Sequence, residues 1–535
     1  MRLVYFTLIC LFIVSISFCL GQEKRNTLKK PVNILFAISD DQSYPYAGAY
    51  GNKTVHTPAF NSVAKQGILF TNAFAASPGC APSRSAILTG RYPWQNEEAG
   101  GHQTLFPLSY KVMVDVMEEN GYFIGYTGKG CAPFNWKLSG RKRNPAGPAF
   151  NKIRYSNENE LPANGISGVN YSANFEQFLS LKPKDKPFFF WYGAFEPHRR
   201  FEQGSGLKAG KKQEDVFVPG FLPDHTPIQT DIMDYALEVD WFDYHLGKMI
   251  KSLEEAGELE NTIIIVTSDN GMAFPRAKAN CYEYGIHVPL AISWPREIKG
   301  NRVVDDLISL ADLTPTIFDI IGITPEGMKP ITGKSFYNIL SSNKQGLIDP
   351  TRTAVYSSRE RHSSARWSNL GYPIRSIRTQ DFLYIRNYTP ERWPSGAPQM
   401  LNAHDPSQME NMYGLNAEGK FEEKAFWDID AAPSKTYLIE NHAKKEVAYY
   451  FDLSMAKRPK DELYDIKNDP YCLKNLANSP AYAKKLEQLK NKLTEFLKET
   501  GDPRHVGPDP DIFENYQRFS IMRPFPKPDW IKQDE

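Results

Sequence analysis

Four apolar runs in the sequence stop abruptly at polar residues. The runs are "VNILFAIS", "GYFIGYTG", "FFFWYGAF" and "TIIIVTS", and a long amphipathic pattern over 232–257 that ends in glycine predicts a helix between the last two. Continuous apolar runs are typical of strands buried on both faces, as in parallel α/β sheets. Ligands bind such sheets beyond the carboxyl ends of the strands. The residues that follow the runs are therefore the first candidates for a functional site: Asp40, Asp41, Lys129, His198, Asp269 and Asn270.

Two of these strand ends carry adjacent oxygen-bearing side chains, the carboxylates of Asp40 and Asp41 at one and the Asp269 carboxylate with the Asn270 amide at the other. A single Asp at a strand end is more often a helix cap or a turn residue than a metal ligand. Paired carboxylates change that balance, because they repel each other unless a cation lies between them. Asp and Asn offer only oxygen ligands, which suit a hard ion such as Ca²⁺, at about 2.3–2.6 Å, or Mg²⁺. The sequence lacks the His and Cys spacing of a zinc site.

A second candidate region is "SPGCAPSRSAILTGR", residues 77–91. Pro82 suits the first turn of a helix, so Cys80 would lie just outside a helix N-terminus. The free N–H groups and the dipole there favour anions. Arg84, within one turn, can bind an oxyanion through two hydrogen bonds. Together with a hard metal ion, this pattern indicates attack on a sulfate or phosphate ester.

The stretch "CAPSRSAILTGR" resembles the signature of the type I sulfatases, Cys-x-Pro-Ser-Arg followed by Leu-Thr-Gly-Arg. "FEPHR", "DNGMAFP" and "GYPIRS" are similar to the heparan N-sulfatase (sulfamidase) branch and its bacterial polysaccharide-acting relatives. The resemblance implies that Cys80 is oxidised to formylglycine (3-oxoalanine), whose hydrate supplies the attacking oxygen. It also implies an α/β fold like that of alkaline phosphatase. That fold has a mixed, largely parallel sheet flanked by helices, plus a smaller C-terminal antiparallel sheet.

The resemblance further implies roles for individual residues. Arg84 would steady the aldehyde hydrate, and His198 would protonate the leaving oxygen or nitrogen. Lys129 and Lys278 would hold sulfate oxygens, with Arg276 as an open alternative to Lys278. The implied ligands of a bound Ca²⁺ are Asp40, Asp41, Asp269, Asn270 and the formylglycine formed from Cys80.

The sequence departs from the family pattern at one position. The family usually has Gly-Lys-x-His, but "GKGCA" puts Cys131 where the histidine would stand. In the family that histidine helps to activate or release the formylglycine oxygen. Its role is therefore either lost here or taken by another residue, such as His102 or His287.

The N-terminus reads "MRLVYFTLICLFIVSISFCLG" and predicts a secretory signal peptide over 1–21, with a membrane anchor as the alternative. We therefore expect an exported protein, periplasmic or secreted, without stable membrane insertion. The cysteines after residue 21 are widely spaced and form no CxxC pair, so no disulfide scaffold is indicated. With 63 basic and 62 acidic residues, the chain has almost no net charge, so it lacks the overall positive electrostatic potential that would attract nucleic acid.

Three regions are predicted after the signal peptide. They are an N-terminal α/β catalytic domain over 30–342, a C-terminal α+β subdomain over 351–500, and a surface-wrapping tail over 501–535. An amphipathic helix near Lys485 is expected to pack on the C-terminal sheet. The proline-rich, aromatic composition of the tail predicts no domain of its own.

The expected partners are a sulfated polysaccharide or its oligosaccharides, such as ulvan, carrageenan or a heparan-like chain, and a formylglycine-generating enzyme. "RERHSSARW" is either a solvated charge run or a subsite for anionic sugars, and the arginines considered for that subsite are Arg359, Arg361, Arg366 and Arg375. Two rival functions stay open. One is a formylglycine-dependent phosphonate or phosphate ester hydrolase, which Asn270 disfavours because such relatives carry Asp-His there. The other is a non-catalytic carbohydrate-binding protein.

Overall fold

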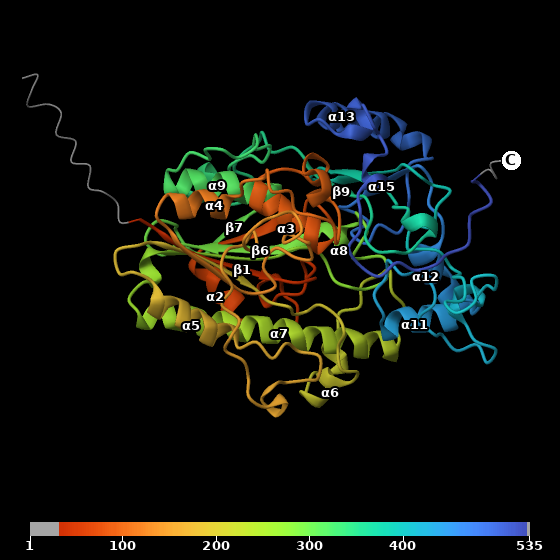
Figure 1. Ribbon diagram of the computed structural model, residues 1–535, viewed down its shortest axis with the longest axis horizontal. Helices are drawn as coiled ribbons and strands as arrows, with labels where there is room; N and C mark the ends of the chain where they lie inside the picture. The colour runs from red at the N-terminus through yellow and green to blue at the C-terminus, as the bar shows by residue number, and fades with distance from the viewer. Residues whose placement is uncertain (1–30, 532–535) are drawn as a thin grey trace, which may run out of the picture.

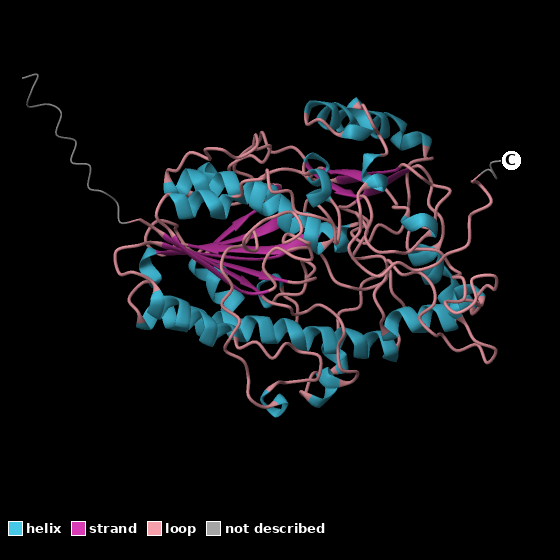
Figure 2. Ribbon diagram, viewed as in Figure 1, coloured by secondary structure: helices cyan, strands magenta, loops and turns pink. Residues whose placement is uncertain are grey.

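The centre of the computed structural model, which describes residues 31–531, is a mixed eight-stranded sheet (Figures 1 and 2). Its strand order is β3-β4-β1-β5-β6-β2-β7, and β8 also pairs with β2. The four apolar runs form four neighbouring parallel strands, as predicted. These are β3 (Phe123–Gly128), β4 (Phe188–Gly193), β1 (Asn33–Ser39) and β5 (Thr262–Ser268).

The other half of the sheet makes it mixed. Strand β6 (His287–Ser293) runs antiparallel to both β5 and β2 (Ile68–Phe74). Strands β7 (Arg302–Val304) and β8 (Ile308–Ser309) lie parallel to β2. The functional edge of the sheet thus belongs to its parallel half, where the carboxyl ends of four strands point the same way.

Helices cover both faces of this sheet (Figure 1). Ile34 and Phe36 of β1 pack on the side of three helices: α3 (Cys80–Thr89), α4 (Met113–Glu119) and α9 (Leu313–Ile321). Leu35 and Ala37 face the other side, with α2 (Pro58–Gln66), α5 (Tyr171–Leu181) and α7 (Thr226–Glu255). Burial on both faces explains why the runs are continuous. The predicted helix over 232–257 lies within α7, which begins earlier, at Thr226.

A separate four-stranded antiparallel sheet has the order β12-β11-β10-β9 (Figure 2). Its strands are β9 (Val355–Arg359), β10 (Ile374–Arg378), β11 (Phe382–Asn387) and β12 (Asp461–Asp465). Helix α13 (Ala483–Glu499) buries Leu489, Leu493 and Leu497 against this sheet, as the amphipathic pattern predicts. The predicted fold class is therefore confirmed.

The remaining helices are mostly short. Helix α11 (Pro433–Glu440) packs against α7 and is followed by α12 (Lys445–Met455). Single-turn helices are α6 (Ser205–Lys208), α8 (Glu283–Ile286), α10 (Tyr337–Leu340), α14 (Pro503–Val506) and α15 (Ile512–Asn515). The last two lie in the tail, for which composition predicts no domain of its own.

The predicted signal peptide lies outside the described residues. Between residues 31 and 531, no helix is long and apolar enough to cross a bilayer. The four cysteines in that range are buried free thiols: Cys80, Cys131, Cys281 and Cys472. The limits of the catalytic domain, the subdomain and the tail stay predictions.

Candidate active site

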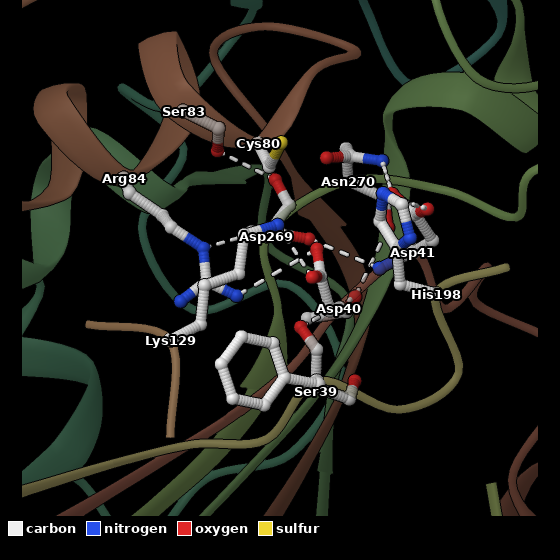
Figure 3. A network of polar contacts seen from close by, with 12 residues as sticks. Ser39, Asp40, Asp41, Cys80, Ser83, Arg84, Lys129, His198, Asp269 and Asn270 are labelled. Atoms are coloured by element: carbon white, nitrogen blue, oxygen red, sulfur yellow. Dashed lines mark hydrogen bonds and ion pairs between the residues drawn. The ribbon is translucent and has the colours of Figure 1, made fainter. Parts of the chain in front are cut away.

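The two acidic strand ends meet at one edge of the sheet. Ser39 of β1 pairs with Ser268 of β5, so the residues that follow both strands emerge side by side. Asp41 adopts a left-handed backbone with φ of 75°, which turns the chain sharply after β1. Its backbone N–H donates to Asp269 Oδ1 at 3.1 Å. All four side chains of these two strand ends are buried. Figure 3 shows them gathered in one cluster.

Helix α3 brings the cysteine to this edge. Cys80 is its first residue, rather than the residue before the helix, and Gly79 is the N-cap. Arg84, one turn on, donates from Nε to Asp269 Oδ2 at 2.7 Å and from Nη1 to the Gly130 carbonyl at 2.8 Å. Arg84 therefore fixes α3 to the end of β5, and its guanidinium offsets part of the buried negative charge.

Three ligand-type side chains converge in the centre of the site. Ligand atoms of Asp40, Cys80 and Asp269 all lie within 4.8 Å of one another. Two oxygen atoms here, Asp40 Oδ1 and Asn270 Oδ1, are buried without a hydrogen-bond partner. A buried acceptor without a partner is costly unless a donor or a cation meets it. The oxygens and their burial therefore fit a hard metal ion.

The two lysines predicted from the sequence form ion pairs with two of the carboxylates that are candidate metal ligands. Lys129 Nζ forms an ion pair with Asp40, and Lys278 Nζ lies 2.6 Å from Asp41 Oδ2. Burial is the largest influence on Asp40 and opposes its charge, but Lys129, His198 and Arg84 together outweigh it and hold the pKa of Asp40 below its ordinary value. Burial likewise opposes the charge of Lys278, yet the carboxylates of Asp41 and Asp430 raise its pKa well above the ordinary value. Both lysines are thus cations in the folded protein.

His198 lies at the open side of the site, with its side chain 36% exposed. Its Nδ1 is 2.7 Å from the carbonyl oxygen of Arg199, which can only accept, so Nδ1 carries a proton. The other nitrogen, Nε2, lies 3.9 Å from Asp41 Oδ2. The backbone thereby fixes which nitrogen of His198 faces the centre of the site.

The structure separates the alternatives that the sequence left open. Arg276 points away from the site, because it donates to the carbonyls of Leu453 and Cys472 and stacks on Tyr282. His287 is held on β6 between Glu283 and the Thr71 carbonyl. His102, by contrast, has Nε2 at 3.4 Å from Cys80 Sγ.

Cys131 does not replace the family histidine. Its side chain is buried in the hydrophobic core between the sheet and helices α3, α4 and α9. Its backbone N–H donates to Asn144 Oδ1 at 3.0 Å. Among the residues that the sequence offered, His102 is the one that reaches the cysteine.

The sugar-binding role considered for Arg359, Arg361 and Arg375 is wrong, and the "RERHSSARW" stretch is not a solvated charge run either. Arg359 and Arg366 are buried and share the carboxylate of Asp428. Arg361 is buried and donates to the carbonyl of Tyr516 at 2.7 Å. Arg375 is fully buried, 2.8 Å from Asp502 and 2.6 Å from Glu360. Arg359, Arg361 and Arg375 thus join internal segments and are not accessible to a sugar, whereas Arg366 also lines a cavity of about 460 Å³ beside Trp367.

Sequence reasoning missed two residues at the site. His362 belongs to "RERHSSARW", and its ring lies 4.9 Å from that of His102. A Cβ at Gly79 would come within 3.3 Å of His362 Nδ1, so the N-cap has little room for a side chain. Burial, followed by the charge of Lys278, lowers the pKa of His362 to about 3. Asp430 lies 3.4 Å from Lys278 Nζ. Both come from loops without a strand-end or helix signal.

The C-terminal tail completes the rim of the site. Arg518 donates to the His362 carbonyl at 3.1 Å and lies 3.5 Å from that of His102. The Phe519 N–H donates to the Gln103 carbonyl at 2.8 Å. The tail therefore ties together the two loops that carry the histidines.

A cleft of about 770 Å³ opens onto this arrangement, within the usual range of small-molecule sites. Asp40, Cys80, Lys129 and His198 all line it. Arg154 lines it too. Its exposed guanidinium has no ion-pair partner in the part of the chain that the structure describes. A cysteine at a helix N-terminus, set among buried carboxylates and cations beside such a cleft, defines the active site of a hydrolase for anionic esters.

Comparison with known proteins agrees with this class. A family model described as Sulfatase matches residues 32–323, and one described as N-sulphoglucosamine sulphohydrolase, C-terminal, matches 276–427. An ulvan-active sulfatase of Formosa agariphila is 26% identical, over 98% of this chain and 85% of that protein. Human N-sulphoglucosamine sulphohydrolase is 28% identical, over 90% of this chain and 92% of that protein. The solved structure of a protein with its substrate D-glucosamine-2-N,6-O-disulfate superposes with a TM-score of 0.60 at 19% identity, covering 90% of this chain and 99% of that one.

The chain belongs to the sulfatase family and is a sulfuric ester hydrolase. The family identified from "CAPSRSAILTGR" is thereby confirmed, including the resemblance to the heparan N-sulfatase branch.

Proposed function

We propose that the protein releases sulfate from a sulfated polysaccharide or its oligosaccharides, either an algal polymer such as ulvan or carrageenan or a heparan-like chain. The observation that carries the proposal is the convergence of Cys80, Asp40 and Asp269 beneath an anion-binding helix N-terminus, with Lys129 and Lys278 alongside. The unpaired Arg154 in the same cleft suits a second anionic group on the sugar. The relatives named for ulvan and for N-sulphoglucosamine support a saccharide substrate.

The test is a screen of the purified, matured protein against oligosaccharides of heparan, carrageenan, ulvan and fucan, with released sulfate as the readout. We expect release from at least one class at a kcat/KM well above that for a small aryl sulfate. A protein that cleaves only the aryl sulfate would refute the saccharide assignment. A protein that binds these sugars but releases no sulfate would favour the carbohydrate-binding alternative.

We propose Ca²⁺ as the metal, held by Asp40, Asp41, Asp269, Asn270 and the modified Cys80. The unpartnered buried oxygens of Asp40 and Asn270 support a hard cation, and the amide oxygen of Asn270 supports calcium over a transition metal. The ion would polarise the sulfate oxygens and balance the charge of the carboxylates.

Chelation is expected to remove activity, and added Ca²⁺ to restore it. Asn270→Ala should lower kcat/KM by about 10²-fold or more, since ligand loss typically weakens metal binding and activity together. Asn72→Ala, on β2, is a matched control and should keep both activity and calcium dependence. If Zn²⁺ or Mn²⁺ restored activity and Ca²⁺ did not, the phosphonate hydrolase alternative would replace the sulfatase.

We propose that Cys80 acts in its oxidised form, formylglycine, made by a formylglycine-generating enzyme. Burial raises the pKa of the Cys80 thiol, so the thiol itself is a poor nucleophile at neutral pH. Formylglycine, as its hydrate, supplies the hydroxyl that attacks sulfur. This chain's own residues then do the rest. Lys129 and Lys278 would bind sulfate oxygens. His198, as an imidazolium, would give its Nε2 proton to the leaving oxygen or nitrogen and keep the Nδ1 proton on the backbone carbonyl.

His102 is proposed to take the role of the missing family histidine. Burial lowers its pKa well below the ordinary value, so the ring is neutral and can accept a hydrogen bond at Nε2, which faces position 80. Arg84, on the same helix α3, is proposed to stabilise the modified residue at position 80 from the side opposite His102.

His102→Gln is expected to lower kcat by about 10²-fold, because the group at position 80 loses its hydrogen-bond partner. His287→Gln is the matched control and should keep kcat in the folded enzyme. Measuring kcat and the melting temperature of both variants separates chemistry from stability. Equal kcat for His102→Gln and the unaltered protein would show that no histidine replaces the one lost at Cys131.

Export is part of the proposal. The apolar segment within residues 1–21 supports a cleaved signal peptide and a periplasmic or secreted enzyme, which would meet polymers and their fragments. N-terminal sequencing of protein from the culture medium or the periplasm should find a start near Gln22. An uncleaved chain in the membrane fraction would favour the anchor alternative.

A further inference from the structure

Next to the active-site cleft lies a second hollow of about 300 Å³, here called the rim pocket. Gln103 and Pro133 line both cavities and form the step between them. The rest of the rim pocket comes from residues 134–137 and from Phe519 of the tail. The rim pocket is therefore the immediate neighbour of the cleft that holds the catalytic cysteine.

Hydrogen bonds between three distant segments hold the walls of the rim pocket together. The Gln103 N–H donates to the Pro133 carbonyl at 3.1 Å, and the Asn135 N–H to the Thr104 carbonyl at 2.9 Å. On the other side, the Phe519 N–H donates to the Gln103 carbonyl. Phe134 packs edge-to-face on Phe106, with ring centroids 5.4 Å apart. The pocket is thus formed in advance by the fold.

The groups that face this pocket combine an aromatic surface with free polar groups. Trp136 and Phe519 are half-buried, so part of each ring stays accessible. Lys137 Nζ lies 5.5 Å from the Trp136 ring centroid and has no carboxylate partner among residues 31–531. The side-chain amide of Gln103 likewise makes no hydrogen bond within that range. The pocket thus differs from the cluster around Asp428, where Arg359 and Arg366 both bind one buried carboxylate.

These groups match one class of ligand. An aromatic ring packs on the C–H face of a sugar, an amide bonds to its hydroxyls, and an unpaired ammonium group binds a sulfate or carboxylate. We propose that the rim pocket is a subsite for the sugar unit next to the one that loses its sulfate, and that Lys137 recognises an anionic group on that neighbouring unit. The assignment rests on the proposed function. It makes the enzyme selective for chains with acidic groups on consecutive sugars.

The test compares KM for a sulfated oligosaccharide with KM for its sulfated monosaccharide. Lys137→Glu reverses an exposed charge, so the variant should fold. The ratio of the two KM values is expected to rise about tenfold, the effect of losing one such contact. Trp136→Ala should raise the ratio similarly. Lys484→Glu, an exposed reversal on α13 away from the cleft, is the matched control and should leave the ratio unchanged.

The outcomes separate the two proposals. If the unaltered protein released no sulfate from any sugar, the proposed function would fail. If it released sulfate while Lys137→Glu and Trp136→Ala left the KM ratio unchanged, the function would stand and the rim-pocket subsite would be overturned. A rise in the ratio that also appears for an oligosaccharide lacking charge on the neighbouring sugar would overturn the role of Lys137.

Discussion

Replacing Cys80 by alanine is expected to lower kcat/KM for sulfate release by at least about 10⁴-fold, the scale seen when a covalent nucleophile is removed. No neighbouring side chain can stand in for it. Within the group that converges at the site, Asp40 and Asp269 are carboxylates already engaged by Lys129 and Arg84. Alanine suits the first turn of α3, so the fold and the melting temperature should change little.

Mass spectrometry of the peptide that contains Cys80 provides the second half of this test. Protein made with a formylglycine-generating enzyme should carry an aldehyde at this position, in proportion to its activity. Cys472→Ala is the matched control, because Cys472 is a buried thiol in the hydrophobic cluster around the smaller sheet. That variant should lose stability but keep its turnover. Fully active protein with only unmodified cysteine would rule out the formylglycine mechanism.

Replacing Arg375 by methionine is expected to lower the free energy of unfolding by about 3–5 kcal/mol, as is typical when one member of a buried ion pair is removed. Arg375 is fully buried on β10 and binds both oxygens of Asp502, at 2.8 and 3.1 Å. Its other partner, Glu360, would keep Arg504 at 2.7 Å. Asp502 would instead be left as a buried carboxylate without its ion pair, and that is the source of the cost.

The KM values of the Arg375→Met variant distinguish a structural role of Arg375 from a sugar-binding role. KM values for the oligosaccharide and the monosaccharide should be equal to those of the unaltered protein, measured at a temperature where the variant is folded. Lys484→Met, on the exposed face of α13, controls for the loss of one positive charge. Unchanged stability combined with a raised oligosaccharide KM would restore the sugar-binding role that the buried geometry argues against.

Much of the catalytic half of the fold could be predicted because its signals are local. Strands β1, β3, β4 and β5 are continuous apolar runs, and the polar residues after them reach the site because parallel strands end at the same edge. The turn before α3 is equally readable, since a proline in the first helical turn marks where the helix begins. These elements can be predicted without knowing which distant segments they contact.

The parts that sequence reasoning missed depend on contacts between distant segments. His362 and Asp430 reach the site from two separate loops, and no local pattern shows where such loops lie in the fold. The sequence offers His102 only as one of two alternatives, because its approach to Cys80 likewise depends on the fold. The error over Arg359 and Arg375 has the same origin. An arginine is read as a surface cation unless its partner is known, and Asp428 and Asp502 lie far along the chain.

The hydrogen bonds between the tail and the two histidine loops mean that the surroundings of the active site depend on residues synthesised late. Cys80 is synthesised early. The contacts of Arg518 with His362 and of Phe519 with Gln103 can form only after residues 518 and 519 have been synthesised. Chain ends are where proteases usually cut without harm. In this protein, cleavage ahead of Tyr516 would instead remove Phe519 from the rim pocket, together with the hydrogen bonds that Arg518 and Phe519 make to the two histidine loops.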